Sequence, residues 1–142
     1  MKNLNNYINE AWSGVKKQSL EQEIKSWCDE MGIKNYTINT KGEIDVDGDV
    51  NLGEKDFEEL PYKFGKVNGL FSLAWCENLT SLKNCPYFVG DTFSMENCSQ
   101  LDSLEGCPKE VKGNFWCGNC KRDFTKEEIK SICKVKKYIF LI

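Results

Sequence analysis

An internal repeat of 22 residues constrains the fold of this 142-residue chain more than any other feature. Segments 79–100 and 101–122 align without a gap, and their shared positions are Leu79/Leu101, Leu82/Leu104, Cys85/Cys107, Pro86/Pro108, Val89/Val111, Phe93/Phe115 and Cys98/Cys120. Segment 57–78 keeps the same register, and segment 44–52 forms a partial unit at an offset of 21 residues. A unit this short cannot bury its apolar face alone, so successive units must stack into a solenoid with a continuous core.

Each unit contains a stretch that is apolar at alternate positions, such as Val67-x-Gly69-x-Phe71-x-Leu73. This period of two predicts a short strand with one inward face in every unit. The Leu-x-x-Leu and Cys-Pro segments lie between these stretches, and we expect them to turn the chain and return it to the next strand.

The stretch Phe71-x-Leu73-x-x-Cys76-x-x-Leu79-x-x-Leu82 resembles a cysteine-containing leucine-rich repeat, and the resemblance covers residues 44–122. It departs from the family pattern at Asn68, where the family has the first leucine of the unit. Units of the form Leu-x-Ser-Leu-x-x-Cys-Pro-x-x-Val-x-Gly-x-Phe are also similar to those of proteins of large tailed phages. The expected fold class is therefore α+β: a short leucine-rich-repeat-like solenoid with helical caps at both ends.

Four segments follow along the chain: an N-terminal amphipathic peptide and flexible linker (1–18), an N-terminal cap (19–43), the solenoid (44–122) and a C-terminal cap (123–142). Residues 19–22 form a capping-box pattern that predicts the start of the first cap helix. Residues 33–46 predict a strand, a turn at Lys41-Gly42 and a second strand. Residues 125–128 form another capping box before a short helix with Ile129 and Ile132 inward, and residues 138–142 predict a terminal strand.

The stretch Trp116-Cys117-Gly118-Asn119-Cys120 resembles the redox motif of thioredoxin-like proteins. In the repeat, however, Cys117 shares a core position with Leu73 and Met95, whereas Cys120 shares a turn position with Cys76 and Cys98. A small thiol at that turn can pack and donate a weak hydrogen bond to a carbonyl. We therefore expect core packing, with a zinc site or a redox dithiol as the alternatives. Stacked cysteines at 76, 98 and 120, or at 85 and 107, could also be bridged under oxidising conditions.

Composition excludes several classes of site. The chain has no histidine, which removes mixed Cys/His zinc sites and the commonest general base, and no second C-x-x-C completes a Cys₄ site. Asp45, Asp47, Asp49 and Asn51 alternate, but they lack the glycine and glutamate of an EF-hand loop. We interpret them as a solvated acidic face of the first strand that discourages edge pairing. We therefore expect no metal and no cofactor.

The formal charge of −3 gives no reason to expect a membrane surface or nucleic acid as a partner. The C-terminal end is basic, yet no groove-reading motif accompanies its lysines. No apolar run is long enough to span a membrane, and no secretory signal precedes the repeats, so reduced thiols are expected.

Two tryptophans are the candidate partner-binding residues. Trp116 falls in the outward column of Ser72 and Ser94, and Trp75 falls in the turn column of Asn97 and Asn119. Exposed tryptophans on a regular surface are typical anchors for a protein partner. The alternative is that each packs on a neighbouring rung or cap.

Residues 1–11 form one apolar stripe at helical spacing, followed by polar residues. Met1-Lys2, Tyr7 and Ile8-Asn9-Glu10-Ala11 resemble the capsid-targeting peptide of internal head proteins of T4-like phages. In that family the prohead protease cuts after the glutamate, which implies cleavage between Glu10 and Ala11. The alternative is a plain N-terminal helix.

The favoured hypothesis is a non-enzymatic protein-binding module of a phage, located in the virion head or the host cytoplasm. The phage resemblance implies an inhibitor of a host defence protein that is packaged and delivered with the genome. The alternatives are a structural internal head protein and a zinc- or thiol-dependent protein that uses the C-x-x-C. The partner's identity, the binding face and the oligomeric state are open at this point.

Overall fold

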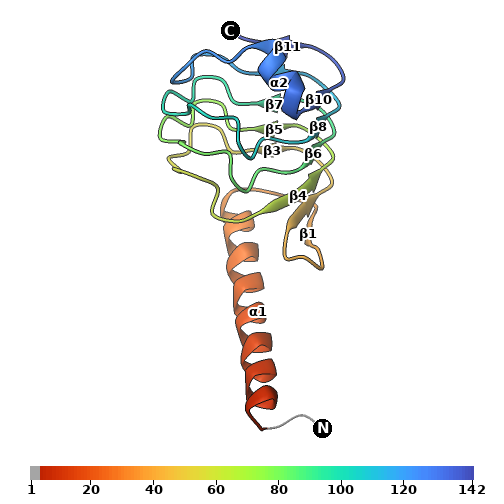
Figure 1. The fold of residues 1–142 in the computed structure, drawn as a ribbon. Coiled ribbons are helices and arrows are strands. Elements are labelled where there is room, and N and C mark those ends of the chain that lie inside the picture. The colour runs from red at the N-terminus through yellow and green to blue at the C-terminus, as the bar shows by residue number, and fades with distance from the viewer. Residues whose placement is uncertain (1–3) are drawn as a thin grey trace. The chain divides into compact units, whose positions relative to one another are not determined.

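The structure is a computed structural model that describes residues 4–142, and the chain divides into two compact units, Met1–Gly32 and Ile33–Ile142. The first unit contains helix α1 (Leu4–Glu30), and the second contains all of the strands and helix α2 (Lys126–Ile132) (Figure 1). Within residues 4–142, no helix combines the length and the apolar character needed to cross a membrane.

Helix α1 is continuous over 27 residues, which corrects the prediction of a flexible linker before a helix that begins at Ser19. Gly14 is the only strong helix breaker in this stretch, and the Lys16-Lys17-Gln18 run has good helix propensity. Ser19 therefore lies within the helix. The capping-box pattern of residues 19–22 matches by spacing alone and does not mark a helix start.

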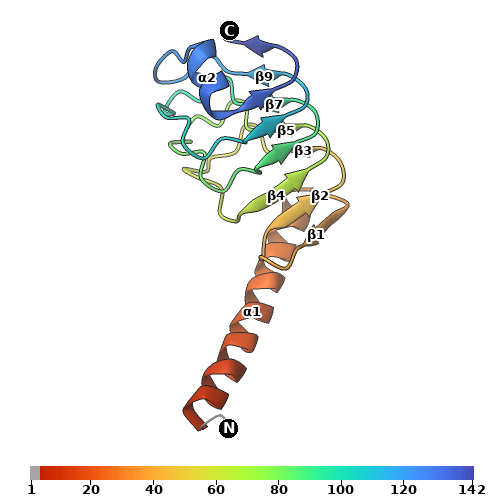
Figure 2. The same ribbon diagram turned by 45° about the vertical axis from the view of Figure 1, so that its right-hand side comes forward.

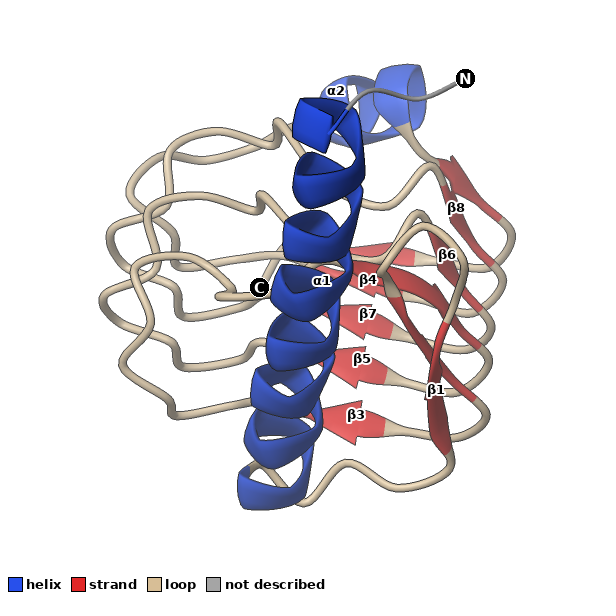
Figure 3. Cartoon of the chain, turned by 90° about the horizontal axis from the view of Figure 1, so that it is seen from below, coloured by secondary structure: helices blue, strands red, loops and turns tan. Residues whose placement is uncertain are grey.

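The second unit is a β-solenoid whose units are offset by about 22 residues and contribute to two sheets (Figure 2). The six-stranded sheet has the order β1 (Tyr36–Ile38), β2 (Ile44–Val46), β4 (Phe64–Val67), β6 (Phe88–Val89), β8 (Glu110–Val111) and β10 (Lys134–Val135). The five-stranded sheet has the order β11 (Ile139–Phe140), β9 (Phe115–Trp116), β7 (Phe93–Ser94), β5 (Phe71–Ser72) and β3 (Val50–Asn51). Strands of both sheets lie on one side of the coil, and loops form the opposite side (Figure 3).

Each unit thus supplies two short strands, where the sequence predicted one. The alternating stretch of the second unit bends between β4 and β5, and the rung-to-rung hydrogen bonds continue through the bend. The Asn68 amide donates to the Val46 carbonyl at 2.9 Å, and the Gly69 amide donates to the Gly48 carbonyl at 3.0 Å. The bend keeps the alternate residues inward while it passes the chain from one sheet to the other.

The core consists of columns of equivalent residues from successive units. Phe71, Phe93 and Phe115 are fully buried, and their ring centroids lie 6.2 and 5.1 Å apart in the column. Val67, Val89 and Val111 form another buried column. The predicted repeat register is confirmed, because Phe71 pairs with Phe93 and Phe93 pairs with Phe115.

Both ends of the solenoid contain the predicted elements. At its start, β1 and β2 form the expected antiparallel hairpin, with Tyr36 opposite Val46. At its end, Thr125 and Glu128 form the expected capping box of α2, and Ile129 is buried. Ile132 was predicted to face inward but is 39% exposed, because the helix ends at that residue. The terminal strand is confirmed as β11, and the structure adds β10 before it.

Candidate functional site

One turn position recurs along the solenoid with the same unusual backbone. Glu54, Trp75, Asn97 and Asn119 all have positive φ angles, of 64°, 64°, 62° and 52° respectively. Each follows a strand of the five-stranded sheet, and the rungs remain hydrogen-bonded here. The Trp75 amide donates to the Glu96 carbonyl at 2.9 Å, and the Asn97 amide donates to the Gly118 carbonyl at 2.8 Å. The stacked backbones therefore impose the left-handed conformation on whichever residue occupies this position.

Asparagine suits this position. Its short polar side chain tolerates a left-handed backbone better than other non-glycine residues do. Asn97 and Asn119 also bond to each other, because Asn119 Nδ2 donates to Asn97 Oδ1 at 3.0 Å. This pair is a hydrogen-bonded side-chain ladder on the surface of the turn.

Trp75 is the only aromatic residue in this column, which begins with Glu54. A bulky side chain at positive φ costs on the order of 1–2 kcal/mol. The side chain is nevertheless 53% exposed, so burial does not offset this strain as it would in a core position. Among the described residues, no other aromatic ring stacks on it. Trp75 therefore presents a large apolar surface from a backbone conformation that disfavours it.

The surroundings of Trp75 are acidic. A shallow hollow of about 360 Å³ is lined by Trp75 together with Glu54, Lys55, Asp56, Glu77 and Asn78. Three carboxylates and one ammonium group thus lie around the indole. This arrangement attracts a cation to a position beside the ring, where a cation–π contact would add to the charge attraction.

Trp116 has a different environment. It lies in β9, and its ring stacks on Phe140 of β11 with centroids 4.2 Å apart and planes inclined by 23°. Trp116 therefore packs on a neighbouring strand, as the alternative interpretation predicted. Trp75 has no such aromatic contact among the described residues. The sequence could not separate the two, because both lie at outward or turn positions and their ring contacts depend on which strand is added beside β9.

The C-x-x-C motif occupies the predicted columns. Cys117 is buried in the core column, and Cys120 donates its thiol to the Met95 carbonyl at 3.5 Å. Cys76 and Cys98 make the same contact with Leu52 and Leu73, each at 3.2 Å. The predicted role of this turn cysteine as a carbonyl donor is confirmed.

Although their columns differ, the two thiols of the motif interact. A hydrogen bond with Cys120 raises the pKa of Cys117, and burial raises it further. The same hydrogen bond lowers the pKa of Cys120, which is partly exposed. The repeat register does not predict this interaction, because column membership gives the position of a residue but not the direction of its side chain.

Cys85 and Cys107 lie in successive rungs as expected, and the structure adds Cys133 to their neighbourhood. Burial raises the pKa of Cys107 to about 11 and that of Cys133 to about 12, and the charge of Cys107 contributes to the shift at Cys133. All eight cysteines are free thiols. The buried thiols at these positions are neutral packing groups.

The acidic stretch does not form one face of one strand. Asp45 lies in β2 and Asn51 in β3, which belong to different sheets. Asp45 accepts a hydrogen bond from the Lys66 amide, and Asp49 accepts one from the Leu70 amide, both at 2.8 Å. Asp45 and Asp49 thus bind the next rung, and Asp47, Asp49 and Asn51 are exposed, so the predicted solvation is confirmed for these three residues while the placement of all four on one strand is wrong. Over residues 4–142, no cluster of three or more potential ligands could hold a metal ion.

The backbone of the expected cleavage site, Glu10–Ala11, lies inside helix α1. The side chains of both residues lie outside the described part of the chain. A protease would therefore need the helix to open locally before it could bind this segment in an extended form.

No family model matches this chain, and neither the curated proteins nor the solved structures include a match.

Proposed function

We propose that this protein is a non-enzymatic binding module that holds a protein partner through Trp75. One observation carries the proposal: an exposed tryptophan occupies a left-handed turn position that the next two rungs fill with asparagine. Residues held in disfavoured backbone conformations cluster at functional sites, because selection for stability alone would remove them. Tryptophan is also the residue type most enriched among binding hot spots.

The fold favours this use of the residue. A solenoid such as a leucine-rich-repeat-like one presents equivalent positions of successive units on a continuous surface, and partners bind along such surfaces. Leu73 and Cys76 flank Trp75 in the chain and are fully buried, so the backbone that carries the indole is anchored in the core. A rigid anchor loses little conformational entropy when a partner binds.

The rim of the site indicates the chemistry of the partner. Glu54, Asp56 and Glu77 lie around the indole, and only Lys55 opposes their charge. A lysine or arginine side chain could place its charge among the carboxylates and its stem on the ring. The proposed partner is therefore a protein segment that presents a basic side chain.

A peptide selection tests this proposal. Random peptides would be selected on the immobilised full-length chain and then counter-selected on a Trp75→Asn variant, which places the residue of the neighbouring rungs in the same backbone. We expect enriched peptides to contain arginine or lysine and to bind the variant at least about tenfold more weakly. A Tyr138→Asn variant is the matched control, because Tyr138 is an exposed aromatic residue at 70% exposure outside this site. Peptides that bind the wild type and the Trp75→Asn variant equally would contradict the proposal.

The proposal also includes delivery of the binder in a phage head, with a host protein as its target. This element rests on the N-terminal resemblance alone. It requires cleavage between Glu10 and Ala11, so the intact mass of the chain recovered from purified virions would correspond to a protein that begins at Ala11. A chain in those particles that still begins at Met1 would contradict the cleavage, and absence of the chain from the particles would contradict packaging.

A further inference from the structure

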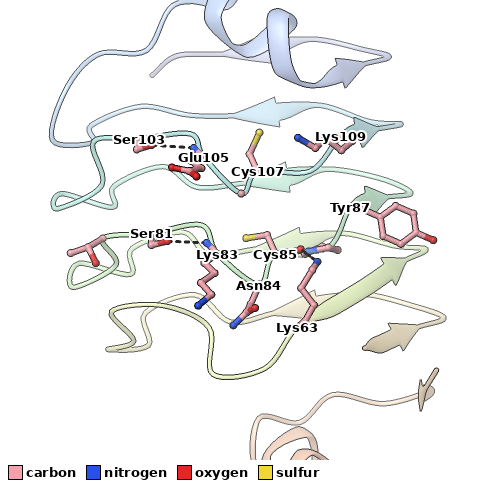
Figure 4. A pocket seen from close by; sticks show the side chains of 13 residues that line it. Lys63, Ser81, Lys83, Asn84, Cys85, Tyr87, Ser103, Glu105, Cys107 and Lys109 are labelled. Atoms are coloured by element: carbon pink, nitrogen blue, oxygen red, sulfur yellow. Dashed lines mark hydrogen bonds between the residues drawn. The ribbon is translucent and has the colours of Figure 1, made fainter. Parts of the chain in front are cut away.

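A second concave site lies among the loops that lead into the six-stranded sheet. The cavity has a volume of about 650 Å³ and opens between segments 80–87 and 103–109, with Lys63 from the preceding unit on its wall. This volume lies within the range of small-molecule sites. Figure 4 shows Cys85 and Cys107 on successive rungs, with Lys63 and Lys83 near the lower rung and Lys109 beside Cys107.

The inner part of the cavity is apolar and uncharged. Cys85 and Cys107 are only 3% and 4% exposed. Pro86, which directly follows Cys85, is also buried. Burial raises the pKa of both thiols, so they carry no charge near neutral pH. These groups can contact an apolar body without presenting an anion of their own.

The wall of the cavity is cationic in a chain whose formal charge is −3. Lys63, Lys83 and Lys109 supply three ammonium groups, and Glu105 supplies the single carboxylate. In the part of the chain that the structure describes, neither Lys83 nor Lys109 forms a salt bridge. Their charges are therefore available to a ligand.

Lys63 is held in place by the scaffold. Its Nζ donates to the carbonyl oxygens of Phe64 at 2.6 Å and of Cys85 at 2.5 Å. An ammonium group has three hydrogens, so one remains for another acceptor. Burial lowers the pKa of Lys63, and an anion bound beside it would oppose that effect.

Two serine hydroxyl groups belong to the polar lining, which also includes Thr80, Asn84 and Tyr87. Ser81 Oγ accepts a hydrogen bond from the Lys83 amide at 3.0 Å, and Ser103 Oγ accepts one from the Glu105 amide at 3.1 Å. These bonds fix both oxygens. Neither hydroxyl hydrogen has an acceptor within residues 4–142, so each can donate to a ligand oxygen.

We propose that this cavity binds a small organic anion whose carboxylate, sulfonate or phosphate group lies among Lys63, Lys83 and Lys109 and whose apolar body rests on Cys85, Pro86 and Cys107. The site is independent of Trp75, which does not line it. The protein would then combine a protein-binding turn with a ligand pocket that shares no lining residue with it.

Two fluorescent probes that differ in one charged group test the proposal. The probe 8-anilinonaphthalene-1-sulfonate carries a sulfonate, and N-phenyl-1-naphthylamine has the same ring system without it. We expect the sulfonate to bind the full chain with 1:1 stoichiometry. A Lys83→Gln/Lys109→Gln variant should bind it about tenfold more weakly or worse, and should bind the neutral probe unchanged. A Lys130→Gln/Lys136→Gln variant removes the same charge from exposed residues outside the cavity and should leave both affinities unchanged.

A cavity-filling variant, Ser103→Trp, distinguishes this cavity from other apolar surfaces. It should abolish binding of both probes while the thermal unfolding transition stays cooperative. Equal affinity of the sulfonate for the wild type and the Lys83→Gln/Lys109→Gln variant would overturn the charge assignment. Retention of both probes by a folded Ser103→Trp variant would overturn the site itself.

Discussion

Asn97 and Asn119 fill the left-handed turn position in the later rungs of the solenoid, whereas Glu54 and Trp75 fill it in the earlier ones. The later pair is suited to the backbone and is joined by a side-chain hydrogen bond of 3.0 Å. Trp75 has the same backbone, but its side chain is exposed and lies among carboxylates. Because every rung imposes the same geometry, the asparagines show what stability alone favours, and the tryptophan marks where another requirement acts.

The largest expected loss of stability comes from a substitution in the buried Phe column, which runs through both the earlier and the later rungs. A Phe93→Ala variant would leave a cavity between Phe71 and Phe115 and should lower the free energy of unfolding by about 3–5 kcal/mol. Urea denaturation followed by circular dichroism measures this loss. Phe88→Ala is the control, because Phe88 is only half-buried with Lys66 over its ring at 4.9 Å, and it should cost much less. Equal losses would mean that the Phe column is not the principal core.

The next test places a tryptophan at the equivalent turn position of a later rung. An Asn97→Trp variant would strain the turn and remove the bond to Asn119, so the free energy of unfolding should fall by about 1–2 kcal/mol. Asn97→Gly separates the two causes, since it removes the hydrogen bond but relieves the strain. If Asn97→Trp were as stable as the wild type in urea denaturation, the left-handed backbone would not distinguish the two residues.

Alkaline pH should lower the free energy of unfolding of the solenoid, because buried cysteines occur in several rungs and not only beside Trp75. Burial raises the pKa of Cys107 from 9.0 to about 11 and that of Cys98 to about 12. Above pH 9 the unfolded chain loses these protons while the folded chain retains them, so stability is complete below that pH and falls as pH rises toward 11. We expect a loss on the order of 1 kcal/mol for each of these thiols between about pH 8 and about pH 10 in urea titrations. A Cys107→Ala variant should show a shallower decline, and an identical decline would mean that other groups cause it.

The smallest expected effect is a gain in stability. Trp75→Asn should relieve the turn and raise the free energy of unfolding by about 0.5–1 kcal/mol, while partner binding is lost. Trp116→Asn is the matched control and should lower it instead, because it removes the stack on Phe140. Differential scanning calorimetry of both variants measures the opposite signs. A loss of stability in Trp75→Asn would show that Trp75 is a packing residue.

The two cysteine groups show how far the repeat carries a prediction. The register placed Cys76, Cys98 and Cys120 at one turn position, and all three donate to a carbonyl there. It did not place Cys133 near Cys107, because the last unit contains α2 and falls out of step with the 22-residue period. Ile139 pairs with Phe115 at an offset of 24 residues.

The same limit applies to the candidate sites. The sequence placed Trp75 in the column of Asn97 and Asn119, but it did not indicate the positive φ angle that makes the residue exceptional. The cavity beside Lys63 was not predicted either. Its lysines occupy unrelated positions of their units, and they share one wall only after the rungs stack.

The sequence by itself determined the repeat length, the inward columns, the β1–β2 hairpin and the capping box of α2. Each of these depends on spacing within one or two units, which a chain carries in its order of residues. Only the tertiary structure decided that each unit bends into two sheets, that α1 is continuous, that Cys117 meets Cys120 and that Trp116 is covered while Trp75 is not. Those outcomes depend on hydrogen bonds and contacts between rungs, which fix backbone angles and side-chain directions that no single unit specifies alone.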